Sequence, residues 1–249
     1  MSTVRRRLDA ELIRRGLAAT PEDALAAIAA GRVTVSGAPA ASPNRLVGRG
    51  DPILVAPEGP SYVSRAGFKL AGALDAFGVD PTGVVALDVG ASTGGFTDCL
   101  LQRGAAAVVT VDVGNGQLDW SLRTDPRVEV HERTDIRTFI APAPYDLVTV
   151  DVSFIGLASL AVALSALVAP GGAIVALVKP QFEAARDDVP PDGIVRDEAV
   201  RTACVEAVTS AFVAAGLVPG GTVESVLRGG EGNVEFFVHM TRPDAGVSA

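Results

Sequence analysis

The sequence is poor in the residues that build disulfide frameworks and metal sites. Among 249 residues there are two cysteines, Cys99 and Cys204, and two histidines, His131 and His239. The cysteines are far apart and belong to no C-x-x-C pair, and the histidines have no metal-ligand spacing. We therefore expect neither a disulfide scaffold nor a metal site.

A long uninterrupted apolar run is also missing. The most apolar stretch, residues 157–178, is broken by Pro170, Gly171 and Gly172, whereas a membrane helix needs about 20 consecutive apolar residues. The stretch is typical of a buried helix, a tight turn and a buried strand. Near the start, Arg5–Arg7 lead into an amphipathic pattern instead of the apolar core of a secretion signal. We therefore expect a cytoplasmic protein that does not enter the membrane.

Excess positive charge, the usual mark of a nucleic-acid binder, is absent from the chain as a whole, whose net charge is −8. The charge is uneven, however. Residues 1–60 carry eight arginines against six acidic residues, and the remainder carries 13 basic against 23 acidic residues. A basic first segment on an acidic body predicts that the first segment meets an anionic partner.

The first 60 residues have the pattern of a small α+β domain. A helix is expected near residues 4–15, and a second one begins after Thr20, a good N-cap followed by Pro21, and is stopped by Gly31. Two short strands are expected at 33–35 and 53–55. From about residue 56, the residues Pro57, Gly59 and Pro60 predict a linker.

Residues 61–249 alternate strand-like and helical stretches. The strand-like runs are Val84–Val89, Ala107–Val113, Val128–Glu132, Leu147–Val152, Ala173–Val178, Thr222–Leu227 and Val234–Met240. This alternation predicts an α/β domain with a mostly parallel sheet. The last two runs are joined by a short glycine-containing loop, so they can pair antiparallel.

A loop of small residues follows the first of these strands. Asp88 precedes the segment Gly90-Ala91-Ser92-Thr93-Gly94-Gly95-Phe96, and a helix is expected to begin near Gly95. Small residues let a ligand approach the backbone, and open α/β sheets bind ligands beyond the carboxyl ends of their strands. Asp112 ends the next strand, where an acid can accept hydrogen bonds from a ribose diol, and Asp135 follows the third. The pattern predicts a nucleoside-type cofactor.

The residues around the loop favour S-adenosylmethionine over a dinucleotide. Ser92 replaces the second glycine of the G-x-G-x-x-G fingerprint. An acid just before the loop suits the ammonium of a methionine moiety better than a pyrophosphate. We expect Asp88 at the ammonium, Asp112 at the ribose diol and Asp135 near the adenine. A dinucleotide site, or a glycine-rich turn without a ligand, is the alternative.

Lysine is also scarce, even among the basic residues. Of 21 basic residues only Lys69 and Lys179 are lysines, and lysine, unlike arginine, can lose its proton in a protein site. Lys179 ends a buried strand, where substrates bind in such sheets, and Asp151 ends another. Glu235 lies in an apolar alternating run, a position that usually faces solvent.

The order Lys69, Asp151, Lys179, Glu235 resembles the Lys-Asp-Lys-Glu tetrad of FtsJ/RrmJ-like ribose 2′-O-methyltransferases. The chain as a whole resembles the TlyA family of ribosomal RNA methyltransferases, also called the haemolysin A family. The segments that carry this resemblance are 64–70, 88–97, 112–118, 151–155, 177–183 and 232–237. Residues 31–37 resemble part of an α-L RNA-binding domain.

The resemblance implies a class I (Rossmann-like) methyltransferase sheet over residues 61–249 and an α-L RNA-binding domain over residues 1–60. It implies S-adenosylmethionine-dependent 2′-O-methylation of cytidine in 16S or 23S ribosomal RNA, or both, within ribosomal subunits, and a link to capreomycin susceptibility. The candidate RNA contacts are Arg6, Arg14 and Arg32.

The chemistry suggests distinct roles for the tetrad. A ribose hydroxyl is a weak nucleophile, so its methylation benefits from a general base. We expect Lys179 to be that base, Asp151 to orient it, and Lys69 and Glu235 to position and tune the site. Two other classes of function stay open, a pore-forming cytolysin and a non-catalytic RNA-binding assembly factor.

Overall fold

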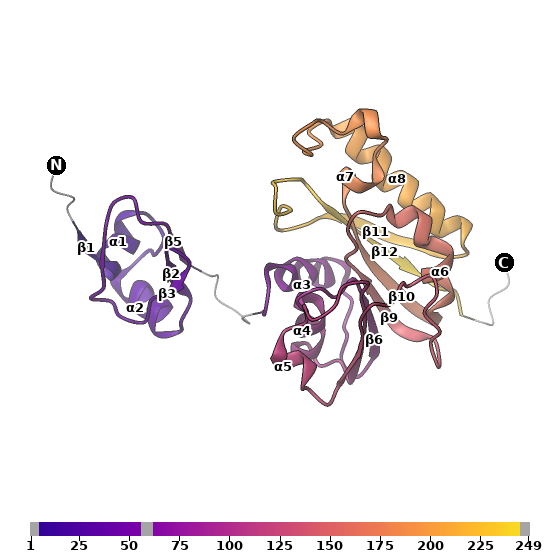
Figure 1. Cartoon of the computed structure of the whole chain (residues 1–249), viewed down its shortest axis with the longest axis horizontal. Coiled ribbons are helices and arrows are strands. Elements are labelled where there is room, and N and C mark those ends of the chain that lie inside the picture. Colours follow the sequence, from indigo (N-terminus) through magenta and orange to yellow (C-terminus); the bar gives the residue numbers. More distant parts are fainter. Residues whose placement is uncertain (1–4, 56–61, 245–249) are drawn as a thin grey trace. The chain divides into compact units, whose positions relative to one another are not determined.

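The chain folds into two units, drawn in Figure 1. The computed structural model describes residues 5–55 and 62–244, and the chain divides into compact units of residues 1–61 and 62–249. The expected linker residues Pro57, Gly59 and Pro60 lie outside the described residues, as does the end of the chain beyond residue 244.

The first unit combines two helices with two small antiparallel sheets. Its elements are β1 (Arg6–Arg7), α1 (Leu8–Arg14), α2 (Pro21–Ala29), β2 (Val33–Val35), β3 (Ala38–Pro39), β4 (Leu46–Val47) and β5 (Ile53–Val55). β1 pairs with β4, and β2 lies between β3 and β5. Leu8 and Leu12 of α1 pack on Ala24 and Ile28 of α2 and on Val33 of β2. The apolar spacing of both helices thus faces one shared core.

The first helix is shorter than expected. The prediction of a helix near residues 4–15 was wrong at its start, because Arg6 and Arg7 pair as a strand with Val47 and Leu46. This pairing joins residues about 40 positions apart, so local helical periodicity could not reveal it. The start of α2 is confirmed: Thr20 and Asp23 form a reciprocal capping box with Pro21 in the first turn.

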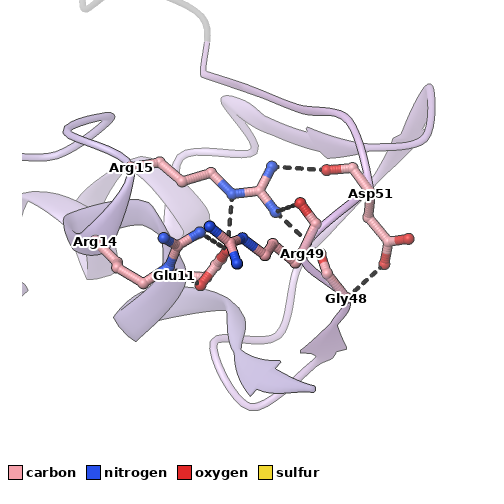
Figure 2. A network of polar contacts seen from close by, with 6 residues as sticks. All are labelled: Glu11, Arg14, Arg15, Gly48, Arg49 and Asp51. Atoms are coloured by element: carbon pink, nitrogen blue, oxygen red, sulfur yellow. Dashed lines mark hydrogen bonds and ion pairs between the residues drawn. The ribbon is translucent and has the colours of Figure 1, made fainter. Parts of the chain in front are cut away.

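A buried carboxylate organises the surface of the first unit, as Figure 2 shows. Glu11 is 1% exposed and accepts hydrogen bonds from the Arg14 and Arg15 guanidinium groups. Arg15 also donates to the carbonyl oxygens of Asp51 and Gly48, at 2.7 and 2.9 Å. The adjacent arginines, Arg14 first, lower the pKa of Glu11 to about 2. The network therefore ties α1 to the turn that precedes β5.

The second unit is a seven-stranded mixed sheet with helices on both faces. Its strands are β6 (Val85–Val89), β7 (Ala107–Val111), β8 (Val128–His131), β9 (Tyr145–Val150), β10 (Val168–Val178), β11 (Val218–Glu224) and β12 (Phe236–Thr241). Its helices are α3 (Arg65–Phe77), α4 (Gly95–Gln102), α5 (Trp120–Arg123), η1 (Leu157–Leu160), α6 (Ala161–Ala166), α7 (Pro180–Glu183), η2 (Arg186–Asp188) and α8 (Glu198–Ala214).

The strand order is β11-β12-β10-β9-β6-β7-β8. The five strands from β10 to β8 are parallel, and β12 pairs antiparallel with both β10 and β11. All seven expected strands are present, and the prediction of an α/β domain with an antiparallel final pair is confirmed.

Two apolar layers flank the sheet. Residues of α6 and α8, such as Leu164 and Phe212, pack with one set of strand residues. Residues of α3 and α4, such as Leu70 and Leu100, pack with the alternate set. Figure 1 shows the sheet between these helix pairs. Because side chains alternate along a strand, a position in the sequence fixes which helix pair it meets.

The apolar stretch 157–178 differs in one respect from expectation. Its first part is helical, as η1 and α6, but the turn expected at residues 170–172 lies inside β10, which bulges between Val168 and Ala173. Gly171 and Gly172 exchange backbone hydrogen bonds with Arg242, which keeps the chain extended there. Within the described residues, no helix has the length and apolarity needed to cross a membrane.

Candidate active site

A cavity of the second unit lies at the carboxyl ends of its parallel strands. This cavity of about 450 Å³ is bounded by the ends of β6, β7 and β9, with Gly90, Asp112, Asp135 and Asp151 among its lining residues. Its volume is within the range of pockets for small-molecule cofactors. The position at the carboxyl edge is the one that an open α/β sheet offers to ligands.

The loop after β6 forms the wall of this cavity because of one glycine. Gly90 has φ +81°, and a Cβ at this position would lie 2.5 Å from the carbonyl oxygen of Asp151. A side chain at position 90 would therefore clash with the backbone just after β9, so the close approach of the two chain segments requires glycine. The loop continues through Ser92, whose backbone N–H donates to Asp112 Oδ2 at 2.8 Å.

Two of the three expected cofactor acids line the cavity. Asp112 also accepts from the backbone N–H of Gly114 at 2.6 Å, and it keeps further lone pairs for a ligand, since each carboxylate oxygen has two. Asp135 is paired with Arg137 at 2.5 Å, and that guanidinium lowers the pKa of Asp135 to about 2. Ile136 and Leu160 add apolar surface to the same cavity.

Asp88 lies elsewhere, which corrects the expectation that its carboxylate contacts a ligand. It is fully buried, and its two oxygens accept from Thr97 Oγ1 at 2.6 Å and from Thr149 Oγ1 at 3.2 Å. Burial raises the pKa of Asp88 to about 7. Because it lies within β6, its side chain points between the sheet and α4, so it supports the loop from beneath.

The other loop residues divide between ligand wall and packing. Ala91, Ser92 and Phe96 line a second cavity of about 150 Å³. Gly94, with φ +95°, is the N-cap of α4, and a Cβ there would lie 2.2 Å from Leu122. Gly95 begins α4, where a Cβ would meet Ala66 of α3 at 2.8 Å. These two glycines therefore allow close packing and do not line either cavity.

Strand alternation places three of the four tetrad residues on one face of the sheet. Asp151 and Lys179 lie one residue after the ends of β9 and β10, and Glu235 lies one residue before the start of the antiparallel strand β12. Counting by twos from Thr149, Leu177 and Phe237 places all three on the face covered by α3 and α4. The β10–β12 register pairs Val178 with Phe236, so the next step sets Lys179 opposite Glu235.

The tetrad consists of two ion pairs. Lys179 Nζ lies 2.6 Å from Asp151 Oδ1, and Lys69 Nζ, on α3, donates to Glu235 Oε2 at 2.5 Å. Lys69 and Glu235 are 9% and 3% exposed. An acid in such an alternating run usually faces solvent, but Glu235 is buried, and its carboxylate is matched by the ammonium of Lys69.

The Lys179–Asp151 pair lies where the smaller cavity adjoins the larger one. Lys179 and Asp151 line it, and Asp151, Gly90, Ser92 and Ser153 line both cavities. Ala66, another lining residue, lies one helical turn before Lys69 on α3. A group in the larger cavity and a group in the smaller one would therefore meet beside the Lys179–Asp151 pair.

Sequence reasoning missed two side chains near this boundary. Ser153 Oγ accepts from Lys179 Nζ at 2.9 Å, and Glu183 accepts from the backbone N–H groups of Leu157 and Ala158 at 2.5 and 3.4 Å. Both residues lie in segments quoted for the family resemblance. Neither carries a local signal of its role, because each contact joins residues about 25 positions apart.

The candidate RNA contacts all lie in the first unit. Arg6 is exposed in β1, and Arg32 is half-buried just before β2. The side chain of Arg14 is 41% exposed while its guanidinium is held by Glu11. Arginine has five N–H donors, so the two donors bound to Glu11 leave three for other partners.

A seven-stranded sheet of this order, with a cofactor-sized cavity at its carboxyl edge, defines the class I methyltransferase fold. The family of FtsJ-like methyltransferases matches residues 62–242. The chain is also 46% identical, over 98% of its length and 93% of the relative's, to the 16S/23S rRNA (cytidine-2′-O)-methyltransferase TlyA of Mycobacterium tuberculosis. The chain therefore belongs to the FtsJ-like methyltransferases, within the TlyA family.

Solved structures agree with this assignment. A hemolysin-named protein from Streptococcus thermophilus superposes with a TM-score of 0.74 and 37% identity, covering 98% of this chain and 90% of that one. An S-adenosylmethionine-dependent methyltransferase from Mesorhizobium loti superposes with a TM-score of 0.54 and 16% identity, covering 70% of this chain and 98% of that one. The second likeness concerns the fold alone.

Proposed function

We propose that this methyltransferase transfers a methyl group from S-adenosylmethionine to the 2′-hydroxyl of cytidine in 16S or 23S ribosomal RNA, or in both, within ribosomal subunits. The observation that carries the proposal is the position of the Lys179–Asp151 pair in the wall between two adjoining cavities. The larger cavity would take the cofactor and the smaller one would admit the ribose.

The residues of the larger cavity fit S-adenosylmethionine. Asp112 has acceptor capacity for a ribose diol, and Asp135 and Ile136 offer a polar and an apolar edge for the adenine. The methionine end would lie along the loop from Gly90 to Ser92, close to Asp151. The cofactor supplies an electrophilic methyl group on a sulfonium.

The remaining chemistry falls to the tetrad. Lys179 is the general base for the ribose hydroxyl, and Asp151 holds the amine at the cavity boundary. Lys69 and Glu235, paired with each other, brace that site from α3 and from the start of β12. The cation of Lys69 and the carboxylate of Glu235 tune the field at Lys179 in opposite directions.

The first unit is proposed to hold the RNA as an α-L RNA-binding domain, with Arg6, Arg14 and Arg32 toward the phosphates. Its charge supports this proposal, because residues 1–60 are basic while the rest of the chain is acidic. Arginine groups bind phosphate well, since their planar fork matches its oxygens.

A direct test supplies purified 30S and 50S subunits with cofactor labelled in its methyl group. The rRNA is then digested to nucleosides, and labelled 2′-O-methylcytidine is expected from at least one subunit. Label in a base, or none in RNA from either subunit, would contradict the proposal. Lysis of erythrocytes by the same preparation, without RNA methylation, would favour a cytolysin.

A further inference from the structure

Two oxygen atoms lie close to Lys179 Nζ, and only one of them forms an aligned hydrogen bond with it. Ser153 Oγ accepts a hydrogen bond from Nζ at 2.9 Å. Asp151 Oδ1 is closer, at 2.6 Å, yet it forms no aligned hydrogen bond with any residue in the described part of the chain. The carboxylate therefore contributes charge, whereas the serine hydroxyl contributes direction.

Direction matters for a lysine that acts as a base. A neutral amine has two N–H bonds and one lone pair, and only the lone pair can take a proton. An acceptor oxygen binds an N–H, and a carboxylate attracts the other N–H and repels the lone pair. With Ser153 and Asp151 at two corners, the lone pair is left at the third corner.

The smaller cavity adjoins the amine of Lys179. Lys179 and Ser153 both line the smaller cavity, and the side chain of Lys179 is only 11% exposed. The Phe182 ring, centred 6.0 Å from Nζ, covers part of the remaining surface. A ribose hydroxyl that enters the smaller cavity would therefore meet the lone pair.

We propose that Ser153 is a positioning residue that orients the amine of Lys179 toward the ribose hydroxyl; this inference rests on the proposed function. The hydroxyl proton passes to the lone pair of Nζ. The O–H electron pair stays on oxygen as that oxygen bonds the methyl carbon, and sulfur keeps the electron pair of the broken S–C bond. Ser153 keeps its own proton throughout.

The test compares Ser153→Ala, Ser153→Thr and the native protein in single-turnover methylation of the ribosomal subunit that the native enzyme modifies. Losing a hydrogen bond to a charged or reacting group costs about tenfold to a hundredfold. Ser153→Ala should lose that factor at every pH, because orientation rather than titration is removed. Ser153→Thr keeps the hydroxyl and should stay within about threefold of native. Ser210→Ala, an exposed serine on α8, is the matched control.

Calorimetry with S-adenosylmethionine separates positioning from cofactor binding, because Ser153 also lines the larger cavity. We expect the affinity of Ser153→Ala for S-adenosylmethionine to stay within about threefold of native. A near-native rate for Ser153→Ala, a loss accounted for by weaker cofactor binding, or a Ser153→Thr variant as slow as alanine would each overturn it. Absence of methylation by the native enzyme would instead refute the proposed function.

Discussion

Lys179 lies beside a carboxylate and a hydroxyl at the wall of the smaller cavity. It is one of two lysines among 21 basic residues, and it lies 2.6 Å from a carboxylate and 2.9 Å from a hydroxyl. A purely electrostatic role could be filled by arginine, whose charge is permanent. A role in proton transfer could not, so the two roles can be separated by one substitution.

We predict that Lys179→Arg fails almost as badly as Lys179→Ala. Removing a general base typically lowers a rate by about 10²–10⁴-fold, and arginine effectively cannot give up its proton. Single-turnover methylation of the ribosomal subunit across a pH series measures the loss, and both variants should still bind S-adenosylmethionine. If Lys179→Arg works at nearly the native rate, Lys179 is a positioning charge and the base must be another group.

Asp88 makes a separate prediction about stability and pH. Burial raises its folded pKa from 3.8 to about 7, so the folded protein binds this proton more tightly than the unfolded chain does. The contribution to stability is complete below about pH 4 and is lost as the pH rises through about 7. One unit of pKa corresponds to about 1.4 kcal/mol, so the effect should be measurable.

The variant Asp88→Asn should remove this dependence. An amide is neutral at every pH and can still bond to Thr97 and Thr149. Thermal unfolding without cofactor, at pH 4 and pH 8, should show Asp88→Asn close to native at pH 4 and more stable than native at pH 8. A constant difference between the two proteins at both pH values would show that Asp88 does not titrate in this range.

At the scale of elements, the loop of residues 151–156 links both cavities to the sheet. It begins where the backbone N–H of Asp151 donates to the carbonyl of Val89 at 2.9 Å. It ends where Glu183 caps η1 through the N–H groups of Leu157 and Ala158. Lys179 and Glu183 lie at the two ends of α7. This single helical turn therefore contacts the loop at two points, through Lys179 at Ser153 and through Glu183 at Leu157.

We predict that Glu183→Ala loosens this loop. Leaving the helix start without its acceptor costs about 1–3 kcal/mol locally, so hydrogen exchange should rise in residues 151–160 and methylation should slow by about tenfold. Glu183→Gln keeps a carbonyl oxygen for Leu157 and should be milder. Glu206→Ala, an exposed acid on α8, is the control. Unchanged exchange in Glu183→Ala would mean that the loop is held by its other contacts.

Much of this architecture was predictable from local patterns. The apolar runs predict the seven strands of the second unit, and Thr20 with Pro21 predicts the start of α2. Contacts between distant segments were not predictable. The pairing of Arg6–Arg7 with Leu46–Val47, the bulge near Gly171 and the bond from Ser153 to Lys179 each depend on residues far apart in the chain.

The candidate site shows the same division. Asp112, Asp135, Asp151 and Lys179 all lie at the cavities because strand ends meet at one edge of a parallel sheet. Asp88 was misplaced because strand alternation turns it away from the edge and toward Thr97. A position one residue inside the strand end is enough to change a ligand-facing acid into a buried support.

At the scale of the whole molecule, the two units differ in charge. Residues 1–60 carry eight basic and six acidic residues, against 13 and 23 in the rest of the chain. Phosphate contacts release counterions, so an RNA complex held by the first unit should weaken steeply with salt. The acidic second unit contains both cavities and the tetrad residues.

We predict that a fragment of residues 62–249 binds S-adenosylmethionine as the full chain does but methylates ribosomal subunits poorly. RNA binding by the full chain should fall as salt rises from 50 to 200 mM, by about tenfold or more for each pair of phosphate contacts. Cofactor calorimetry on the fragment is the control for its folding. Full activity of the fragment on subunits would sink the assignment of RNA binding to the first unit.

The central claim is that this chain places 2′-O-methyl groups on ribosomal RNA with Lys179 as the base. The most direct measurement maps 2′-O-methyl positions on 16S and 23S rRNA from cells that have the gene, that lack it, and that carry Lys179→Arg in its place. The account predicts one or more cytidines that are methylated only with the native gene and unmodified in both other strains. Identical maps in all three strains would contradict it.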